Sequence, residues 1–212
     1  MKTLIYNIGT LAGILPEGVL KLEGEQMGHV ECLHDAYLII EDGIITEFGS
    51  TVLETTFHHS ACNADEYINA NGGFVIPCFC DSHTHIVYAG CRDGEFRDKI
   101  AGLSYEEIAA RGGGILNSAD LLHQTSEDEL YRQAIERVNE IMAMGTGAVE
   151  IKSGYGLTPQ DEIKMLRVIA RLKEETPLVI KSTFLGAHAV GRAYKGRQSE
   201  YVDHVCNDMI PA

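Results

Sequence analysis

An alternation of strand-like and helical segments after Gly73 constrains the fold of this chain more than any other feature. Apolar, strand-like runs cover residues 74–80, 146–152 and 178–184, and helical patterns fill the intervals between them. Strand, helix and strand in this order are typical of a parallel sheet with helical connections. We therefore predict an α/β fold for residues 74–212.

Start signals define three of the predicted helices. Ser104 and Ser126 are each followed three residues later by glutamate, which is the spacing of a capping box. Thr158 is followed directly by proline, a residue that favours the first helical position. We expect these helices to begin just after the three hydroxyl residues, and the third to end before Pro177.

The first 73 residues have a different pattern. Short β runs at 3–8, 36–40 and 44–48 are separated by turn residues, and Asp42-Gly43 is typical of a tight hairpin turn. This pattern predicts a small β unit. We place a domain boundary near Gly72, so that residues 1–73 form part of a β domain and residues 74–212 form the α/β part.

The length limits how much of a barrel the chain can form. A closed (β/α)₈ barrel requires about 250 residues, so residues 74–212 suffice for about four strand and helix units. The chain is then either an open α/β sheet or the first half of a barrel.

Composition excludes several functional classes. The 17 Lys and Arg residues against 31 Asp and Glu give a net charge of −14, which argues against a nucleic-acid-binding protein. No apolar run approaches the length that crosses a bilayer, and the N-terminus has no convincing signal cleavage site. We expect a soluble, cytoplasmic protein without membrane partners, in which the six cysteines are thiols.

A His-x-His motif directly follows the first predicted buried strand. In extended backbone, His83 and His85 point to the same face and can present nitrogens to one ion. Imidazole pairs are ligands for zinc or iron. The alternative is a pair of surface histidines, but the end of a buried strand is where the active sites of barrels lie.

Two later strands are also followed by candidate site residues. Tyr155 follows the strand at 146–152, and His188 follows the strand at 178–184; both are flanked by glycine or small residues. Their alternatives are a packed loop aromatic and a satisfied loop histidine. Arg92 can form a surface ion pair, or it can bind a substrate carboxylate through two hydrogen bonds.

The motifs together resemble the metal-dependent amidohydrolase superfamily and, within it, the imidazolonepropionase family. The resemblance runs from about Asp35 to Ala212. It is carried by the segments DSHTH (81–85), AGCR (89–92), EF (95–96), YEEI (105–108), GGGI (112–115), EIKSGYGL (150–157) and TFLGAH (183–188).

The resemblance implies an amidohydrolase-type (β/α)₈ barrel, of which about the first half is present, preceded by a small β-sandwich unit. It implies hydrolysis of the cyclic amide of 4-imidazolone-5-propanoate to N-formimidoyl-L-glutamate in histidine degradation. His83 and His85 would bind one zinc or iron ion per subunit. Arg92 would hold the propionate, Tyr155 and His188 would contact the substrate, and His188 would also act catalytically on the oxyanion. Full-length members are expected to be homodimers.

The chain departs from the family pattern in two ways. Cys78 follows Pro77 where the family usually has glycine. The family's remaining histidine ligand, its metal-binding aspartate and an acidic substrate-binding residue would lie beyond Ala212. We therefore expect at most half of an active site, which can be inactive alone.

Three alternatives remain open at this point. Lys152 could be carbamylated and bridge two metal ions, as in binuclear amidohydrolases. Cys78, Cys80, His83 and His85 could instead form a structural zinc site in a binding module. The chain could also be a non-catalytic assembly unit.

Overall fold

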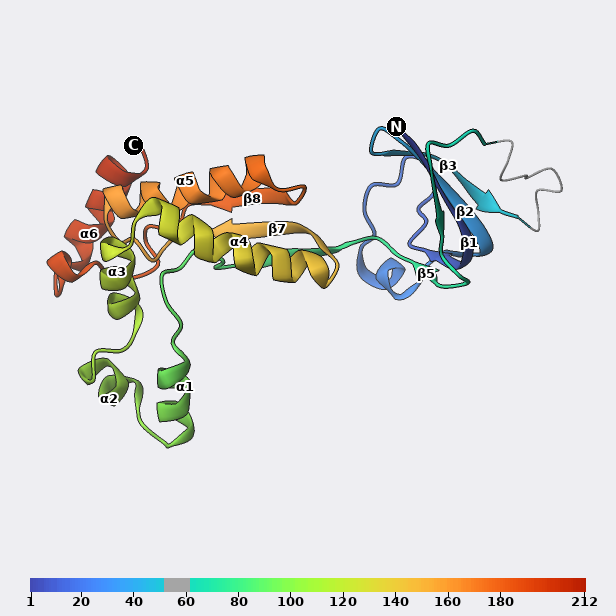
Figure 1. Ribbon diagram of the computed structural model, residues 1–212. Coiled ribbons are helices and arrows are strands. Elements are labelled where there is room, and N and C mark those ends of the chain that lie inside the picture. Colours follow the sequence, from blue (N-terminus) through green and yellow to red (C-terminus); the bar gives the residue numbers. More distant parts are fainter. Residues whose placement is uncertain (52–61) are drawn as a thin grey trace. The chain divides into compact units, whose positions relative to one another are not determined.

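The chain folds into two compact units. The computed structural model describes residues 1–51 and 62–212, and it divides into Met1–Pro77 and Cys78–Ala212 (Figure 1). The boundary lies four residues beyond the predicted one at Gly73. The physical reason is that residues 74–75 pair with the first strand and so remain with the β unit.

The N-terminal unit is built around one mixed sheet. Its strands follow the order β3-β2-β1-β4, and β5 also pairs with β1. The strands are β1 (Lys2–Ala12), β2 (Cys32–Glu41), β3 (Ile44–Ser50), β4 (Glu66–Asn69) and β5 (Phe74–Val75), with a 3₁₀ turn η1 (Gly24–Gly28). The predicted hairpin is confirmed, because β2 and β3 are antiparallel and Asp42 and Gly43 between them both have positive φ. The second sheet of a sandwich stays a prediction.

The expectation of one buried strand across residues 74–80 is wrong. The run is divided into β5 and β6 (Phe79–Thr84), which belong to different sheets. Pro77 lies between them, and proline cannot donate a ladder hydrogen bond. Phe74 and Phe79 are both more than half exposed in the part of the chain described. The run therefore does form strands, but they are two short strands whose residues are mostly exposed instead of one buried strand.

The C-terminal unit contains the predicted parallel sheet. Its three strands lie in the order β6-β7-β8, and both pairs are parallel. The strands β7 (Thr146–Lys152) and β8 (Val179–Thr183) agree with the predicted ones within a residue. The helices are α1 (Asp93–Ile100), α2 (Tyr105–Ala110), α3 (Ile115–Gln124), α4 (Glu127–Ala143), α5 (Pro159–Glu175) and α6 (Gln198–His204), with short turns η3 (Arg192–Tyr194) and η4 (Val205–Met209).

The predicted helix starts are confirmed. The hydroxyls of Ser126 and Thr158 accept hydrogen bonds from backbone N–H groups three residues later. Ser104 and Glu107 form both bonds of a capping box. These local contacts set where α2, α4 and α5 begin.

The core of this unit lies between the sheet and the two long helices. Figure 1 shows α4 and α5 running alongside β7 and β8. Apolar strand residues such as Val149 and Ile180 pack against buried side chains of both helices. The buried apolar residues of these two helices in the core are Leu130, Ala134, Val138, Met165, Val168, Ile169 and Leu172.

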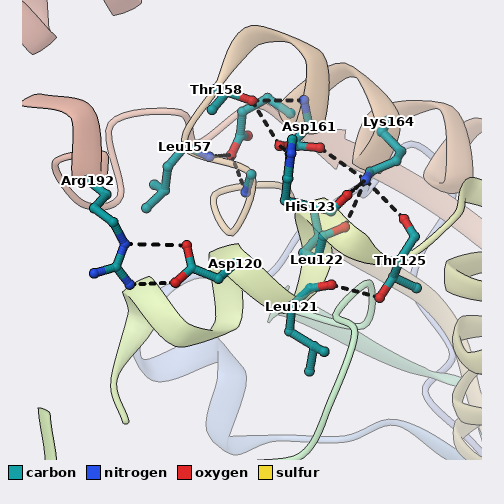
Figure 2. A network of polar contacts seen from close by, with 12 residues as sticks. Asp120, Leu121, Leu122, His123, Thr125, Leu157, Thr158, Asp161, Lys164 and Arg192 are labelled. Carbon is teal, nitrogen blue, oxygen red and sulfur yellow. Dashed lines mark hydrogen bonds and ion pairs between the residues drawn. The ribbon is translucent and has the colours of Figure 1, made fainter. Parts of the chain in front are cut away.

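A polar network joins α3 to the beginning of α5 (Figure 2). The buried carboxylate of Asp161 contacts His123 at 2.8 Å and Lys164 at 3.0 Å. Lys164 also donates to the carbonyls of Leu122 and Thr125 at the end of α3. The network satisfies carbonyls at the helix end and holds α3 against α5.

Two further predictions can be compared with the structure. All six cysteines are free thiols, as expected. Within the described residues, no helix combines the length and the apolar character that a membrane span needs.

Removing a core side chain of α4 should destabilise the unit. Leu130 is fully buried between α4 and the sheet, so Leu130→Ala is expected to lower the free energy of unfolding by about 2–5 kcal/mol. Val202→Ala is the control, because Val202 is about half exposed and should change the value by less than about 0.5 kcal/mol. Urea titrations of both variants measure this, and equal losses would contradict the assigned core.

Candidate active site

The candidate site forms where the three parallel strands of the C-terminal unit end. Because neighbouring parallel strands share a direction, their carboxyl ends meet at one edge of the sheet. His83 is the next-to-last residue of strand β6 and His85 directly follows that strand, while Tyr155 follows β7 and His188 follows β8. The three predicted segments are therefore brought to one edge.

His85 is the centre of this group. Its ring centroid lies 5.0 Å from that of Tyr155, 5.2 Å from that of His188 and 5.7 Å from that of His83. Tyr155 and His188 are themselves 5.9 Å apart. The aromatic and imidazole rings thus form one contiguous cluster.

The electrostatics of the cluster favour a neutral imidazole. Burial lowers the pKa of His85, and the neighbouring His188, His83 and Lys152 lower it further. Burial also raises the pKa of Tyr155, so its phenol stays protonated at neutral pH. A neutral imidazole is the form that binds a metal ion.

The buried Nδ1 atom of His85 supports a fit to a metal. It makes no hydrogen bond in the structure, although buried polar atoms are normally paired. His83 and His85 could supply two nitrogen ligands to one ion. Within residues 1–51 and 62–212, no three His, Cys, Asp or Glu side chains are grouped closely enough to hold an ion.

Two alternative metal sites can be compared with the structure. The zinc site weighed for Cys78, Cys80, His83 and His85 is not assembled in the described residues. Lys152, the residue considered for carbamylation, forms an ion pair with Glu150 at 2.6 Å.

The loop from Ser153 to Leu157 positions Tyr155. The buried Ser153 accepts a hydrogen bond from the N–H of Leu185 at 2.9 Å, and its own N–H donates to Thr183. These bonds join the loop that follows β7 to the loop that follows β8. The two loops that carry Tyr155 and His188 are therefore held to each other by hydrogen bonds.

Arg92 lies at the beginning of α1, next to this cluster. Its Nη2 donates to Glu95, and the hydrogen bond raises the pKa of Arg92. Glu95 also accepts a 2.8 Å bond from the N–H of Gly114, and together with Arg92 this lowers the pKa of Glu95. Both groups are thus charged at neutral pH, and the acid fixes one side of the guanidinium.

A cavity of about 190 Å³ joins Arg92 to the cluster. It is lined by His85, Tyr88, Gly90, Cys91, Arg92, Ser118 and Tyr155. Sequence reasoning missed Tyr88 and Ser118. The guanidinium carbon of Arg137 lies 3.5 Å from the centroid of the Tyr88 ring. Ser118 is on α3. Neither residue belongs to a motif, so only the fold brings them to this cavity.

Comparison with known proteins identifies the family of the chain. No family model matches it. It is 53% identical over 211 residues to an imidazolonepropionase from Flavobacterium psychrophilum, with 100% of this chain and 50% of the relative covered. An imidazolonepropionase from Pseudomonas putida strain GB-1 is 40% identical over 87% of the chain and 45% of the relative. The chain belongs to the imidazolonepropionase family.

The match covers only part of each family member. The chain spans about half the length of the curated imidazolonepropionases that it matches. This agrees with the expectation that it corresponds to half of such a protein.

Solved structures support the fold of this imidazolonepropionase relative. The guanine deaminase of E. coli matches 99% of the chain and 44% of its own length with a TM-score of 0.56 at 9% identity. A metal-dependent hydrolase from Pyrococcus furiosus matches 87% of the chain and 50% of its own length with a TM-score of 0.51 at 12% identity. At these identities the likeness concerns the mixed α/β fold alone.

Substituting Gly156 should damage the loop that carries Tyr155. A Cβ atom there would lie 2.4 Å from the backbone nitrogen of Glu162 and 2.6 Å from the carbonyl carbon of Asp161. Because backbone must move to make room, Gly156→Ala is expected to lower the free energy of unfolding by about 1–3 kcal/mol in urea titrations.

Gly94→Ala is the matched control for this substitution. Gly94 lies within α1, and a Cβ atom there would have nothing within 4 Å. Alanine is favoured over glycine in a helix, so this variant should be neutral or slightly more stable. A Gly156→Ala variant as stable as Gly94→Ala would contradict the close packing at residue 156.

Proposed function

We propose that the chain provides part of the active site of an imidazolonepropionase. The reaction is hydrolysis of the cyclic amide of 4-imidazolone-5-propanoate, which gives N-formimidoyl-L-glutamate. The observation that carries the proposal is the meeting of His83, His85, Tyr155 and His188 at one sheet edge beside Arg92. The names of the relatives support the same substrate.

The proposal includes a finer description of the fold. The C-terminal unit is the first half of an amidohydrolase-type (β/α)₈ barrel, and the N-terminal unit is part of a small β-sandwich. The parallel order β6-β7-β8 with covering helices supports the first statement. The open mixed sheet of the N-terminal unit supports the second.

His83 and His85 would hold one zinc or iron ion per subunit. Such an ion would supply an acidified water molecule and polarise the carbonyl of the substrate ring. The neutral imidazole of His85 and its unpaired Nδ1 suit a ligand role. A tetrahedral ion would require further ligands besides these two.

The other residues bind and orient the substrate. Arg92 uses Nη2 for Glu95, which leaves its other N–H donors for the propionate carboxylate. The ring of Tyr155 forms a wall of the cavity between Arg92 and His85. His188 donates a hydrogen bond to the ring carbonyl oxygen, and this bond strengthens as negative charge develops there. The proposed assembly is a homodimer of full-length subunits.

Turnover and metal content together test the proposal. Ring opening of 4-imidazolone-5-propanoate and bound zinc and iron are measured on one purified sample of the chain. A second sample joins the chain to the half of the Flavobacterium psychrophilum relative that it does not span. The proposal predicts turnover with one ion per chain in at least one sample. Absence of turnover from both folded samples would contradict it.

Replacing the two metal-binding candidates should remove the ion. His83→Ala and His85→Ala are each expected to lower metal affinity at least tenfold, because each removes one nitrogen ligand. Inductively coupled plasma mass spectrometry after dialysis measures the bound metal. His34→Ala in the N-terminal unit is the control, and an equal loss of metal there would point to non-specific binding.

Replacing Arg92 should weaken substrate binding. Arg92→Gln removes a charged donor from the carboxylate, so KM is expected to rise about tenfold or more with little change in kcat. Arg97→Gln on the same helix is the control, because its side chain is exposed and does not line the cavity. A KM unchanged by Arg92→Gln would remove the proposed carboxylate contact.

A further inference from the structure

Glu162 is a buried carboxylate that the proposed reaction does not use. It lies in the first turn of α5, and only 1% of its surface is exposed. Within the described residues, no lysine, arginine or histidine pairs with it. A buried charge without a partner is costly, so its position needs a physical account.

Three backbone groups satisfy this carboxylate. Its Oε2 accepts from the N–H of Gly154 at 2.9 Å. Its Oε1 accepts from the N–H groups of Gly156 at 2.8 Å and Leu157 at 2.9 Å. All three donors belong to the loop that carries Tyr155. The loop is therefore wrapped around an anion, like the backbone concavities that bind phosphate.

The backbone of the loop is shaped for this arrangement. Gly154 has φ of +108° and Leu157 has φ of +56°, both in the left-handed region. Leucine rarely adopts such a conformation, so the surrounding contacts must hold it there. The hydrogen bonds that Gly154, Gly156 and Leu157 donate to Glu162 are such contacts.

The same contacts extend to His188. A Cβ atom on Gly154 would lie 3.0 Å from Cβ of His188 and 3.0 Å from the carbonyl oxygen of Leu185. The His188 N–H in turn donates to that carbonyl. A shift of Gly154 would therefore move the backbone beneath His188 as well as Tyr155.

We propose that Glu162 is a positioning residue for the site, whose carboxylate holds the 153–157 loop so that Tyr155 and His188 face His85. The effect on the loop follows from the contacts alone. Its effect on catalysis rests on the function proposed above. The residue itself touches neither substrate nor metal and acts through Tyr155 and His188.

The neighbouring Asp161 provides a matched control. It is also buried and lies in the same helical turn. Its carboxylate binds His123, Lys164 and Thr158 and makes no bond to the 153–157 loop (Figure 2). Asp161→Asn therefore perturbs the polar contacts of α5 without removing a hydrogen bond to the loop.

The first experiment measures the loop directly by hydrogen exchange in the chain. Glu162→Gln keeps the shape of the side chain but turns an NH₂ group toward one of the three N–H donors. We expect protection of the Gly154, Gly156 and Leu157 amides to fall at least tenfold in this variant, relative to amides of β7. In Asp161→Asn, the ratio of loop to β7 protection should change less than threefold.

The second experiment measures catalysis in whichever sample of the previous section turns over. Glu162→Gln should lower kcat/KM at least tenfold, and Asp161→Asn less than threefold. Because Glu162 acts through Tyr155 and His188, the effects of Glu162→Gln and Tyr155→Ala should not be fully additive. In a Tyr155→Ala background, Glu162→Gln should therefore lower kcat/KM by a smaller factor than in the unmodified chain.

Several results would overturn the proposal. Equal loss of loop and β7 protection in Glu162→Gln would show that Glu162 contributes only to general stability. Full additivity of the kcat/KM losses of Glu162→Gln and Tyr155→Ala would show the same. If Glu162→Gln does not fold, exchange in the unmodified chain decides, and loop amides exchanging at the rate of free peptide would reject the anchor. Failure of turnover alone would reject the proposed function and leave the exchange result standing.

Discussion

The parallel pairing of β6, β7 and β8 is the constraint on which the site depends. Parallel strands place their carboxyl ends together, and each of these strands is followed by a candidate functional side chain. The pairing requires that the sheet be covered, and α4 and α5 provide the apolar cover. Packing of the helices and geometry of the site are therefore two results of one arrangement.

Much of this arrangement could be predicted because its signals are local. Asp42 and Gly43 adopt the positive φ that a tight hairpin needs, and Ser126 and Thr158 form the caps that their spacing indicated. The grouping of His85, Tyr155 and His188 followed from the position of each after a parallel strand. That inference used only the direction of neighbouring strands, which the helical connections determine.

The remaining features depend on contacts between distant residues or on pairing partners. The apolar run at 74–80 gave no sign that Phe74 pairs with β1 while Phe79 joins another sheet. The bond from Gly114 to Glu95 connects residues 19 apart, and the contact of Ser118 with the cavity depends on the path of the chain through α1 and α2. The periodicity of apolar residues along the sequence does not indicate such contacts. In the sequence, Glu162 is only an acidic residue in the first turn of a predicted helix, where the helix dipole already favours a negative charge.

The anchoring of the 153–157 loop by Glu162 limits how this region can evolve. An α-helix turns by about 100° per residue, so one residue inserted between the loop and Glu162 would rotate the carboxylate away from all three N–H groups. The interval from Gly154 to Glu162 must then keep its length even where its side chains change. Substitutions can accumulate at exposed positions such as Gln160, whereas insertions and deletions should be confined to the segments before β7 and after α5.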